Sequence, residues 1–372
     1  MRGPRSSRLW IALAVVVAAV LVAAVVFLAR DGDEQTSSHQ EPPPTVLPGA
    51  VTKASIAGLP LRGVPLERDT GLRLLIADAP APFVFDVDRG TVQPITGLPT
   101  TGERGVSVLA VGDDALILST RFCNRCRGTS AYLLRHRSTA AASLGKALQV
   151  IPARDGEGLW MLTKGPAENC LLGEVKLGGQ RLVAQFLTSC RTGLVAELPA
   201  GLLTTFTGPL GRNAHDDLLR PGGEVSRFGD ESAQPVAGNL LLSGTDRHTP
   251  LLLRDVSTGA TRRLRWPSRP GYSLGQVTGQ SQGRLATIDF ARYSPVDRYD
   301  LRLLDTLTGG WRHLPDMPAH AVPKTTYVQW TADGRVVILA ADALGVWRPG
   351  EAHLAVRRVP PPKQPGIQFV VW

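Results

Sequence analysis

The chain has 372 residues, a formal net charge of +9 and a hydrophobic fraction of 43%, with 39 glycines and 29 prolines. This composition excludes a collagen-like chain, a long coiled coil, a disulfide-dense miniprotein and a multi-span membrane protein, and it is too apolar for a disordered chain. It predicts a turn-rich globular domain with one membrane anchor.

An unbroken apolar run, LWIALAVVVAAVLVAAVVFLA, occupies residues 9–29. As a helix it would span roughly 31 Å, which matches the hydrocarbon core of a bilayer. Arginines precede the run and acidic residues follow it, so the positive-inside rule predicts that residues 1–8 are cytoplasmic and that the rest is extracytoplasmic. A cleaved signal peptide is the alternative, although Phe27 is too large for the −3 position of the best cleavage site. We therefore expect a single-pass cell-membrane protein with an uncleaved signal-anchor helix.

Residues 30–54 are polar and then proline-rich, and they include a triple proline at 42–44. Consecutive prolines favour an extended polyproline II conformation, which has no buried core. We predict that this segment is an extracytoplasmic linker and that residues 55–372 form the folded domain.

One phrase recurs seven times in this domain: an apolar strand, a tight turn and a second strand. The turns are anchored, at a mean spacing of about 43 residues, by Gly90, Ser138, Gly178, Gly222, Gly259, Gly309 and Gly350. Glycine supplies the positive φ that such hairpins require. A second hairpin, more apolar on both faces, lies between these, as in 106–120, 148–163 and 326–341. Each unit therefore holds four strands, and no segment after residue 31 has a convincing helical period.

Seven units of four strands predict an all-β, seven-bladed β-propeller preceded by one transmembrane helix. The apolar C-terminus, IQFVVW (367–372), is expected to close the ring as the innermost strand of the first blade, beside residues 72–77. The alternative is that Arg62–Leu66 fills that position. Pro65 argues against it, because proline cannot donate a hydrogen bond to a central strand.

The segment VQWTADGRVVILAADALGVWRPG (328–350) resembles the repeat of TolB-type and WD-repeat-like propellers. In that repeat a tryptophan precedes a Ser/Thr-x-Asp-Gly turn, and a buried strand follows. The other six units match it only loosely. The resemblance implies a propeller over roughly residues 55–372 and carries no catalytic residues, and it makes Asp333 and Gly334 turn residues.

Four cysteines in an exported protein favour two disulfides. Cys170 and Cys190 flank one outer hairpin at the same end, so we expect them to be bonded, which leaves Cys123 with Cys126. A four-thiolate zinc site is the alternative, but the single C-x2-C pair has no second such pair. A redox-active C-x2-C motif is a further alternative, although the βαβ context of such motifs is missing.

The last three blades carry basic outer strands. The arginines of this basic rim are Arg262, Arg263, Arg265, Arg312, Arg357 and Arg358. Charged edge strands resist aggregation, and this is their simplest interpretation. The functional alternative is a rim that binds anionic envelope polymers or lipid headgroups. The mild charge and the exported location argue against nucleic acid.

No nucleophile elbow, P-loop, dinucleotide fingerprint or metal motif occurs, so we predict no cofactor, no metal and no catalytic residue. The cluster His215-Asp216-Asp217 is expected to lie in a loop, and the tryptophans at 160, 266, 311, 330 and 347 are expected in the core. We therefore expect a non-catalytic binding or scaffold module for a protein or cell-envelope partner. The alternative is an exported hydrolase or lyase with its active site at the central channel. Ligand sensing is least favoured, because only eight residues precede the anchor.

Overall fold

The computed structural model describes residues 61–372 except 68, 78–81, 99–104, 121–127, 167–168, 179–180, 208–213, 230–232, 246–247, 268–270, 280–283, 293–297, 318–321, 324–326, 341–342, 360–367 and 372. The predicted anchor, the linker and the Cys123–Cys126 pair lie outside the described residues. Within them, no helix has the length and apolar character needed to cross a bilayer.

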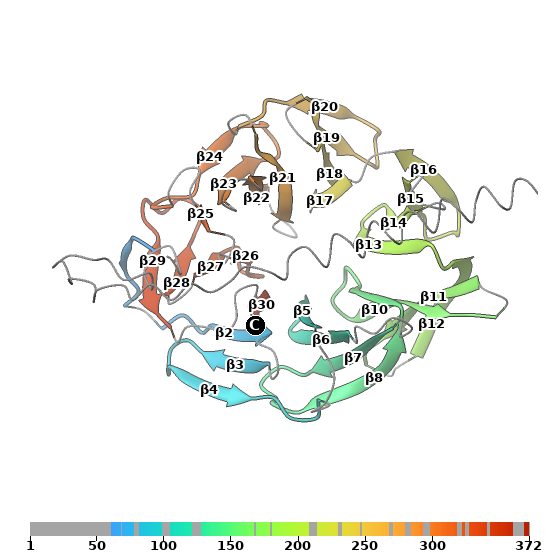
Figure 1. Ribbon diagram of the computed structural model, residues 1–372, viewed down its shortest axis with the longest axis horizontal. Coiled ribbons are helices and arrows are strands. Elements are labelled where there is room, and N and C mark those ends of the chain that lie inside the picture. The colour runs from blue at the N-terminus through green and yellow to red at the C-terminus, as the bar shows by residue number, and fades with distance from the viewer. Residues whose placement is uncertain are drawn as a thin grey trace, which may run out of the picture. The chain divides into compact units, whose positions relative to one another are not determined.

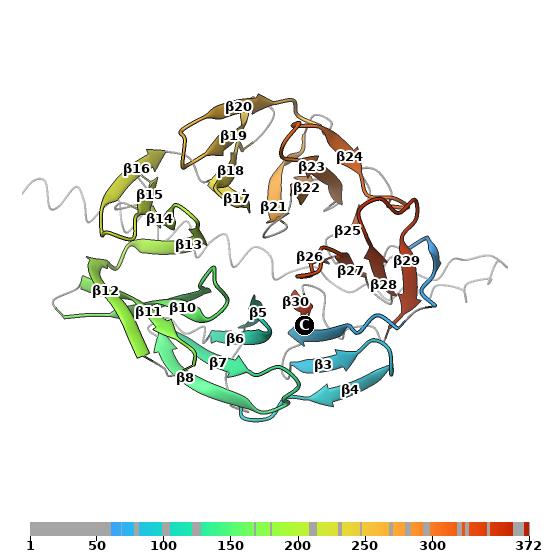
Figure 2. The same ribbon diagram turned by 180° about the vertical axis from the view of Figure 1, so that it is seen from behind.

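The described residues form seven antiparallel sheets arranged as a ring around a central axis, so the prediction of an all-β, seven-bladed propeller is confirmed. Each blade has four strands in sequence order from the axis outward, apart from the first, and the reverse view shows the same order (Figures 1 and 2). No helix occurs among the described residues.

The strands of blades 1 to 4, from the axis outward, are β30 (Gln368–Val371), β2 (Arg73–Ala77), β3 (Phe83–Asp86) and β4 (Thr91–Pro94); β5 (Gly105–Val111), β6 (Asp114–Thr120), β7 (Thr129–Leu134) and β8 (Ala141–Ala147); β9 (Gln149–Pro152), β10 (Gly158–Lys164), β11 (Asn169–Lys176) and β12 (Arg181–Ser189); and β13 (Thr192–Leu198), β14 (Gly201–Phe206), β15 (His215–Leu219) and β16 (Val225–Gly229).

The strands of blades 5 to 7 are β17 (Ala233–Ala237), β18 (Leu240–Ser243), β19 (Leu251–Asp255) and β20 (Thr261–Leu264); β21 (Ser273–Gly279), β22 (Leu285–Arg292), β23 (Arg298–Asp305) and β24 (Trp311–His313); and β26 (Tyr327–Trp330), β27 (Val336–Ala340), β28 (Ala343–Trp347) and β29 (Ala355–Arg358). Two-residue strands add to two of these sheets: β25 (Val322–Pro323) pairs with β23, and β1 (Val64–Pro65) pairs with β29.

Four of the seven predicted turn anchors have the positive φ expected of them: 68° at Gly90, 75° at Gly259, 75° at Gly309 and 102° at Gly350. The other three do not. In blade 4 the positive φ falls on Gly223, at 82°, and in blade 2 it falls on Arg137, at 64°, whereas Gly178 of blade 3 is not a positive-φ residue. The hairpin needs a left-handed residue near this position, and the local hydrogen bonds of each loop select which residue adopts it.

The ring is closed by both ends of the domain. β30 pairs antiparallel with β2, with Val371 opposite Leu74, so the expected C-terminal closure is confirmed. The alternative for residues 62–66 is wrong, because β1 pairs parallel with the outermost strand of blade 7 and not with the centre of blade 1. Pro65 is tolerated there because an edge strand does not need every N–H.

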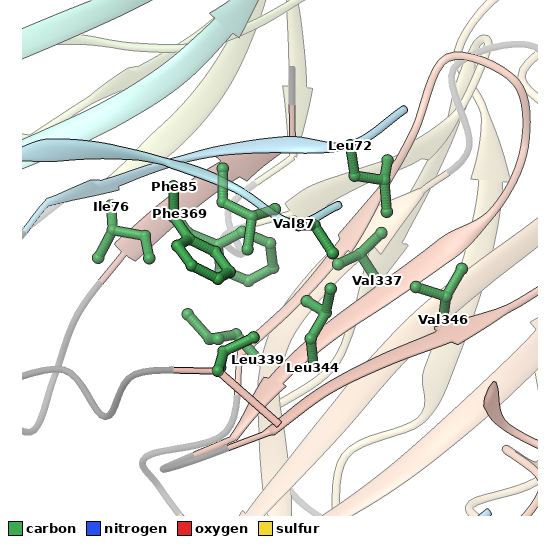
Figure 3. Close-up of a cluster of buried hydrophobic side chains, with 11 residues drawn as sticks. Leu72, Ile76, Phe85, Val87, Val337, Leu339, Leu344, Val346 and Phe369 are labelled. Carbon is green, nitrogen blue, oxygen red and sulfur yellow. The ribbon is translucent and has the colours of Figure 1, made fainter. Parts of the chain in front are cut away.

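The hydrophobic core follows the interfaces between blades, and Figure 3 shows the one at the closure. Phe369 of β30 is 1% exposed and lies with Leu74, Ile76 and Phe85 of blade 1 against residues of blade 7. The blade 7 side of this cluster consists of Val337, Leu339, Leu344 and Val346. The predicted tryptophans are also core residues: Trp160 and Trp347 are buried, and Trp266, Trp311 and Trp330 are partly buried against the core clusters.

Two glutamines, Gln149 and Gln234, each connect one blade to a neighbouring blade through a pair of hydrogen bonds. Gln149 of β9 donates from Nε2 to the Leu194 carbonyl (2.8 Å) and accepts from the Leu194 N–H (2.7 Å), in blade 4. Gln234 of β17 makes the same pair of bonds to blade 6, with Gly275 O at 2.8 Å and Val277 N at 3.1 Å. Both targets lie at irregularities of the inner strand, where the sheet itself leaves backbone groups unpaired. The glutamine amide supplies the missing partners and fixes the blade-to-blade register.

The Cys170–Cys190 disulfide is present, as expected, with a Cα–Cα distance of 4.9 Å. It joins the first part of β11 to the residue that follows β12, so it fastens the open end of that hairpin. Because this bond occupies two of the four thiols, it leaves no four-thiolate set for zinc.

Candidate functional site

The closure of the ring creates a cavity of about 520 Å3 between blade 7 and the segment that leads into blade 1. We call it the seam groove. Its apolar lining consists of Val64, Pro65, Leu66, Val346 and Ala355. Its charged lining consists of Glu67, Asp69, Arg335, Arg348 and Glu351, and the imidazole of His353 lies beside them. The groove therefore combines an apolar surface with both signs of charge.

The turn that resembles the TolB-type repeat positions one wall of the groove. Gly334 has a φ of 80°, and its N–H donates to the Thr331 carbonyl (3.0 Å). Thr331 Oγ1 accepts from the Arg335 N–H (2.8 Å) and donates to Asp333. Asp333 and Gly334 are therefore turn residues, as the resemblance implies. Although burial acts in the opposite direction, hydrogen bonds from Thr331 and Arg335 lower the pKa of Asp333 and keep it ionised.

Two arginines fasten the seam beside the groove. Arg335 of blade 7 donates to the Thr70 carbonyl (2.9 Å). Arg357 donates to the carbonyls of Leu66 (3.0 Å) and Val87 (2.9 Å), so it joins blade 7, the leading segment and blade 1. Its guanidinium also lies 3.3 Å from Oδ1 of Asp88. These bonds hold the leading segment as one wall of a preformed groove.

Asp88 completes the seam from the blade 1 side. Its carboxylate accepts from the N–H groups of Thr70 and Gly71, at 2.7–2.9 Å, and from the Thr70 hydroxyl at 2.8 Å. Burial would raise the pKa of Asp88, but these bonds and the Arg357 charge outweigh it and lower the pKa. The ionised carboxylate therefore anchors the same segment that Arg335 and Arg357 hold.

Other charged groups of the groove are open to solvent. The Arg348 side chain is 57% exposed, and its guanidinium approaches Asp333 only to 3.9 Å. The His353 side chain is 61% exposed, with Nδ1 3.3 Å from Asp316 of the segment that follows blade 6. Glu67 and Asp69 are exposed on the opposite wall. These side chains can reorient toward a ligand, whereas Arg335 and the backbone of the leading segment are fixed.

The six arginines of the predicted basic rim differ in their contacts. Arg262 donates to the carbonyls of Thr306 and Leu307 in the next blade, and Arg357 belongs to the seam. The guanidinium carbon of Arg312 lies 5.7 Å from the centroid of the Trp347 ring. Arg263, Arg265 and Arg358 are exposed on the outer surfaces of blades 5 and 7. At least three of the six therefore contact a neighbouring blade, and binding by the rim stays a prediction.

The contribution of the Arg262 contact to stability can be tested by comparison with Arg263, the next residue of the same strand. Arg262→Met removes two hydrogen bonds to backbone carbonyls, and we expect it to lower the free energy of unfolding by about 1.5 kcal/mol. Arg263→Met changes an exposed side chain and should stay within about 0.5 kcal/mol of the wild type. Urea unfolding of both variants measures the difference, and equal effects would show that Arg262 does not act as a link.

The cluster His215-Asp216-Asp217 forms the first three residues of strand β15, so the prediction that it lies in a loop is wrong. Because side chains alternate along a strand, Asp216 faces blade 5, where it accepts from the Ala233 N–H (2.9 Å), while His215 pairs with Asp217 at 3.3 Å. Burial raises the pKa of Asp216. The alternation separates these groups, and among the described residues no three His, Cys, Asp or Glu side chains come close enough to hold a metal ion.

Besides Asp216, a second buried acid is Asp289, which the sequence does not indicate because it lies within an apolar strand. Asp289 of β22 lies next to the irregular stretch of β21 that Gln234 holds. Burial raises the pKa of Asp289 to about 7, although hydrogen bonds from the N–H groups of Gln276 and of Asp289 itself act to lower it. Its Oδ1 is buried and has no hydrogen-bond partner among the described residues. Asp216 and Asp289 lie in blades 4 and 6, on either side of blade 5.

No protein-family profile matches the chain, and no curated protein matches it. Among solved structures, it is similar to the β-propeller domain of the trilobed protease from Pyrococcus furiosus, with 10% identity over 78% of this chain and 94% of that one, at a TM-score of 0.51. It is also similar to the acylaminoacyl peptidase of Pyrococcus horikoshii, with 11% identity and a TM-score of 0.51 over 77% of this chain. This chain spans 50% of that peptidase. At such identities the likeness shows the fold alone: the protein is a seven-bladed β-propeller.

Proposed function

We propose that this protein is a membrane-anchored, extracytoplasmic propeller that binds a partner protein at the seam groove and performs no catalysis itself. The observation that carries the proposal is the groove: a preformed cavity of about 520 Å3 with an apolar surface and both signs of charge. Its walls are fixed by hydrogen bonds before any ligand arrives, which lowers the entropic cost of binding.

The mixed lining favours a protein segment over an anionic envelope polymer. Glu67, Asp69 and Glu351 would repel a chain of uniformly negative groups, even with Arg348 and His353 nearby. A peptide can place apolar side chains on the apolar lining and offer charges of either sign to the rest of the groove. The chemistry of the groove therefore favours a protein partner among the two classes that the sequence predicts.

Two features support the location. The apolar run at 9–29, with arginines before it and acidic residues after it, has the length and charge asymmetry of a single-pass anchor. It lies outside the described residues. The Cys170–Cys190 disulfide is typical of proteins that fold in an oxidising compartment. Both features favour a domain on the extracytoplasmic side.

Site-specific photocrosslinking in the host membrane tests the proposal. A photoreactive amino acid at Arg348, in the groove, should give a discrete adduct with a protein, whereas the same group at exposed Arg263 should not. Reversing the exposed wall with Glu67→Lys and Asp69→Lys should abolish the adduct, because the charge pattern of the groove is inverted. The absence of an adduct at 348, or equal adducts at both positions, would refute binding at the groove.

The alternative of an exported hydrolase or lyase stays a prediction. The propeller-containing peptidases among the similar structures fit it only at the level of the fold. The seam groove is lined by β1 and by Ala355 of the outermost strand of blade 7, whereas the alternative requires a site at the central axis. We therefore place the binding function first.

A further inference from the structure

Strand β12 differs from the other outer edges of the ring. It has nine residues, whereas β4, β16, β20 and β24 have three to five. Its sequence, RLVAQFLTS, contains no proline or glycine and only one charge, at its first residue. The other edges carry the features that block strand addition: Pro94 ends β4, Lys146 lies in β8, arginines lie in β16, β20 and β24, and β1 covers β29.

The edge of β12 is also held rigid. Its pairing with β11 extends from Lys176 opposite Arg181 to Asn169 opposite Ser189, with one irregularity between Leu182 and Ala184, and the Cys170–Cys190 disulfide closes the far end. Residues 185–189 are paired without interruption. Phe186 stacks on Trp160 of the same blade, with ring centroids 6.4 Å apart. The strand lies at the outer perimeter of the ring, where another molecule can approach it (Figure 1).

An exposed apolar residue lies in the uncharged half of this edge. Leu187 is 64% exposed, and the residues around it in the strand, QFLTS (185–189), carry no charge. An added strand places a neighbouring side chain beside such a leucine and so removes part of its apolar surface from water. This half of β12 therefore has both the backbone geometry and the apolar surface that an added strand requires.

We infer that β12 is a dimerisation edge, at which it pairs antiparallel with β12 of a second copy of this chain. A two-fold axis through Leu187 places this leucine opposite its own copy, Phe186 opposite Thr188, and Gln185 opposite Ser189. No like charges then oppose each other, and the two edges present the same pattern, as a two-fold interface requires. The two outer edges join two blades of four strands into one continuous sheet.

The second copy is favoured over an unfolded peptide by entropy. A peptide must order each residue that pairs, at a cost of about 1–2 kcal/mol per residue. Both β12 strands are already extended and fastened, so their pairing avoids that cost. This inference does not depend on the seam groove, which is lined by residues of blade 7 and of the leading segment.

Sedimentation equilibrium of the full chain in detergent micelles tests the inference. The wild type should form a concentration-dependent dimer. Leu187→Lys and Leu187→Glu each place like charges opposite each other at the axis and should weaken the dimer by about fivefold or more. An equimolar mixture of the two variants should recover it, because the opposed charges then attract. Recovery by mixing is specific to a pairing in which position 187 faces itself.

A matched control keeps the result interpretable. Val225→Lys changes a 60% exposed residue on the outer edge of blade 4 and should not weaken the dimer. The thermal unfolding midpoint of each variant verifies that the fold is intact. A wild type that is monomeric at all concentrations, or a dimer that neither substitution at Leu187 weakens, would overturn the inference.

Discussion

Replacing Phe369 by alanine is expected to lower the free energy of unfolding by about 3–5 kcal/mol, although the residue lies near the C-terminus. Phe369 is 1% exposed, and its ring lies in the cluster that joins blade 7 to blade 1 (Figure 3). The substitution leaves a cavity at the closure of the ring, where β30 belongs to blade 1 only through its pairing with β2.

The matched control is Val92→Ala in the outer strand of the same blade. Val92 is 49% exposed, so its truncation should change stability by less than about 0.5 kcal/mol. Urea unfolding followed by tryptophan fluorescence measures both variants. If Phe369→Ala costs no more than Val92→Ala, the ring does not depend on C-terminal closure, and the role assigned to β30 is wrong.

The second large effect is a pH dependence at Asp289. Burial raises the pKa of its carboxyl group in the folded protein from 3.8 to about 7. Between these two pKa values the folded state keeps a proton that the unfolded state has lost, so stability falls as the pH rises. The loss from this one group amounts to about 4 kcal/mol and is complete once the pH exceeds the folded pKa of about 7. The raised pKa thus favours the fold at low pH.

Asp289→Asn keeps the shape of the side chain and cannot ionise. The variant should be more stable than the wild type at about pH 8, and the difference should shrink as the pH falls toward about 4. Urea unfolding at a series of pH values measures this difference. A difference between the wild type and Asp289→Asn that does not change with pH would show that Asp289 is ionised throughout.

Asp255→Asn serves as a control of opposite sign. Hydrogen bonds from Ser257 and Thr258 lower the pKa of Asp255 against burial. Its stabilising effect is therefore present above the unfolded pKa and is lost as the pH falls through the lower, folded pKa. The effect of Asp255→Asn should be constant from about pH 5 to about pH 8 and should diminish only in more acidic solution.

The repeat and the turn chemistry made the fold predictable from the sequence. Gly90, Gly259 and Gly309 belong to the hairpins that recur about every 43 residues, the length of a four-strand unit, and the apolar tail requires a partner strand. The same local reasoning placed Cys170 beside Cys190, because two residues that flank a hairpin at one end are close in any register.

The sequence was less informative where a residue's role depends on the neighbouring blade. Arg262 and Arg357 belong to a row of basic residues in the sequence, but the structure directs them to carbonyls of other blades. The polar sequence around His215 is typical of a loop, yet His215 begins a strand because β14 provides its pairing partner. Asp289 gave no signal at all, since its unusual pKa arises from burial against β21 and β23 and from nothing in the adjacent sequence.

The amino-acid sequence by itself determined the class of fold, the number of blades, the strand that closes the ring and one disulfide, because each follows from periodicity or from contacts within one hairpin. Only the tertiary structure decided that residues 64–65 add to the outside of blade 7 and that a groove forms between them and the turns at Arg335 and Arg348. The physical reason is distance along the chain: Arg335 and Thr70, which join the two walls, are 265 residues apart and meet only when the ring closes, so no local pattern encodes their contact.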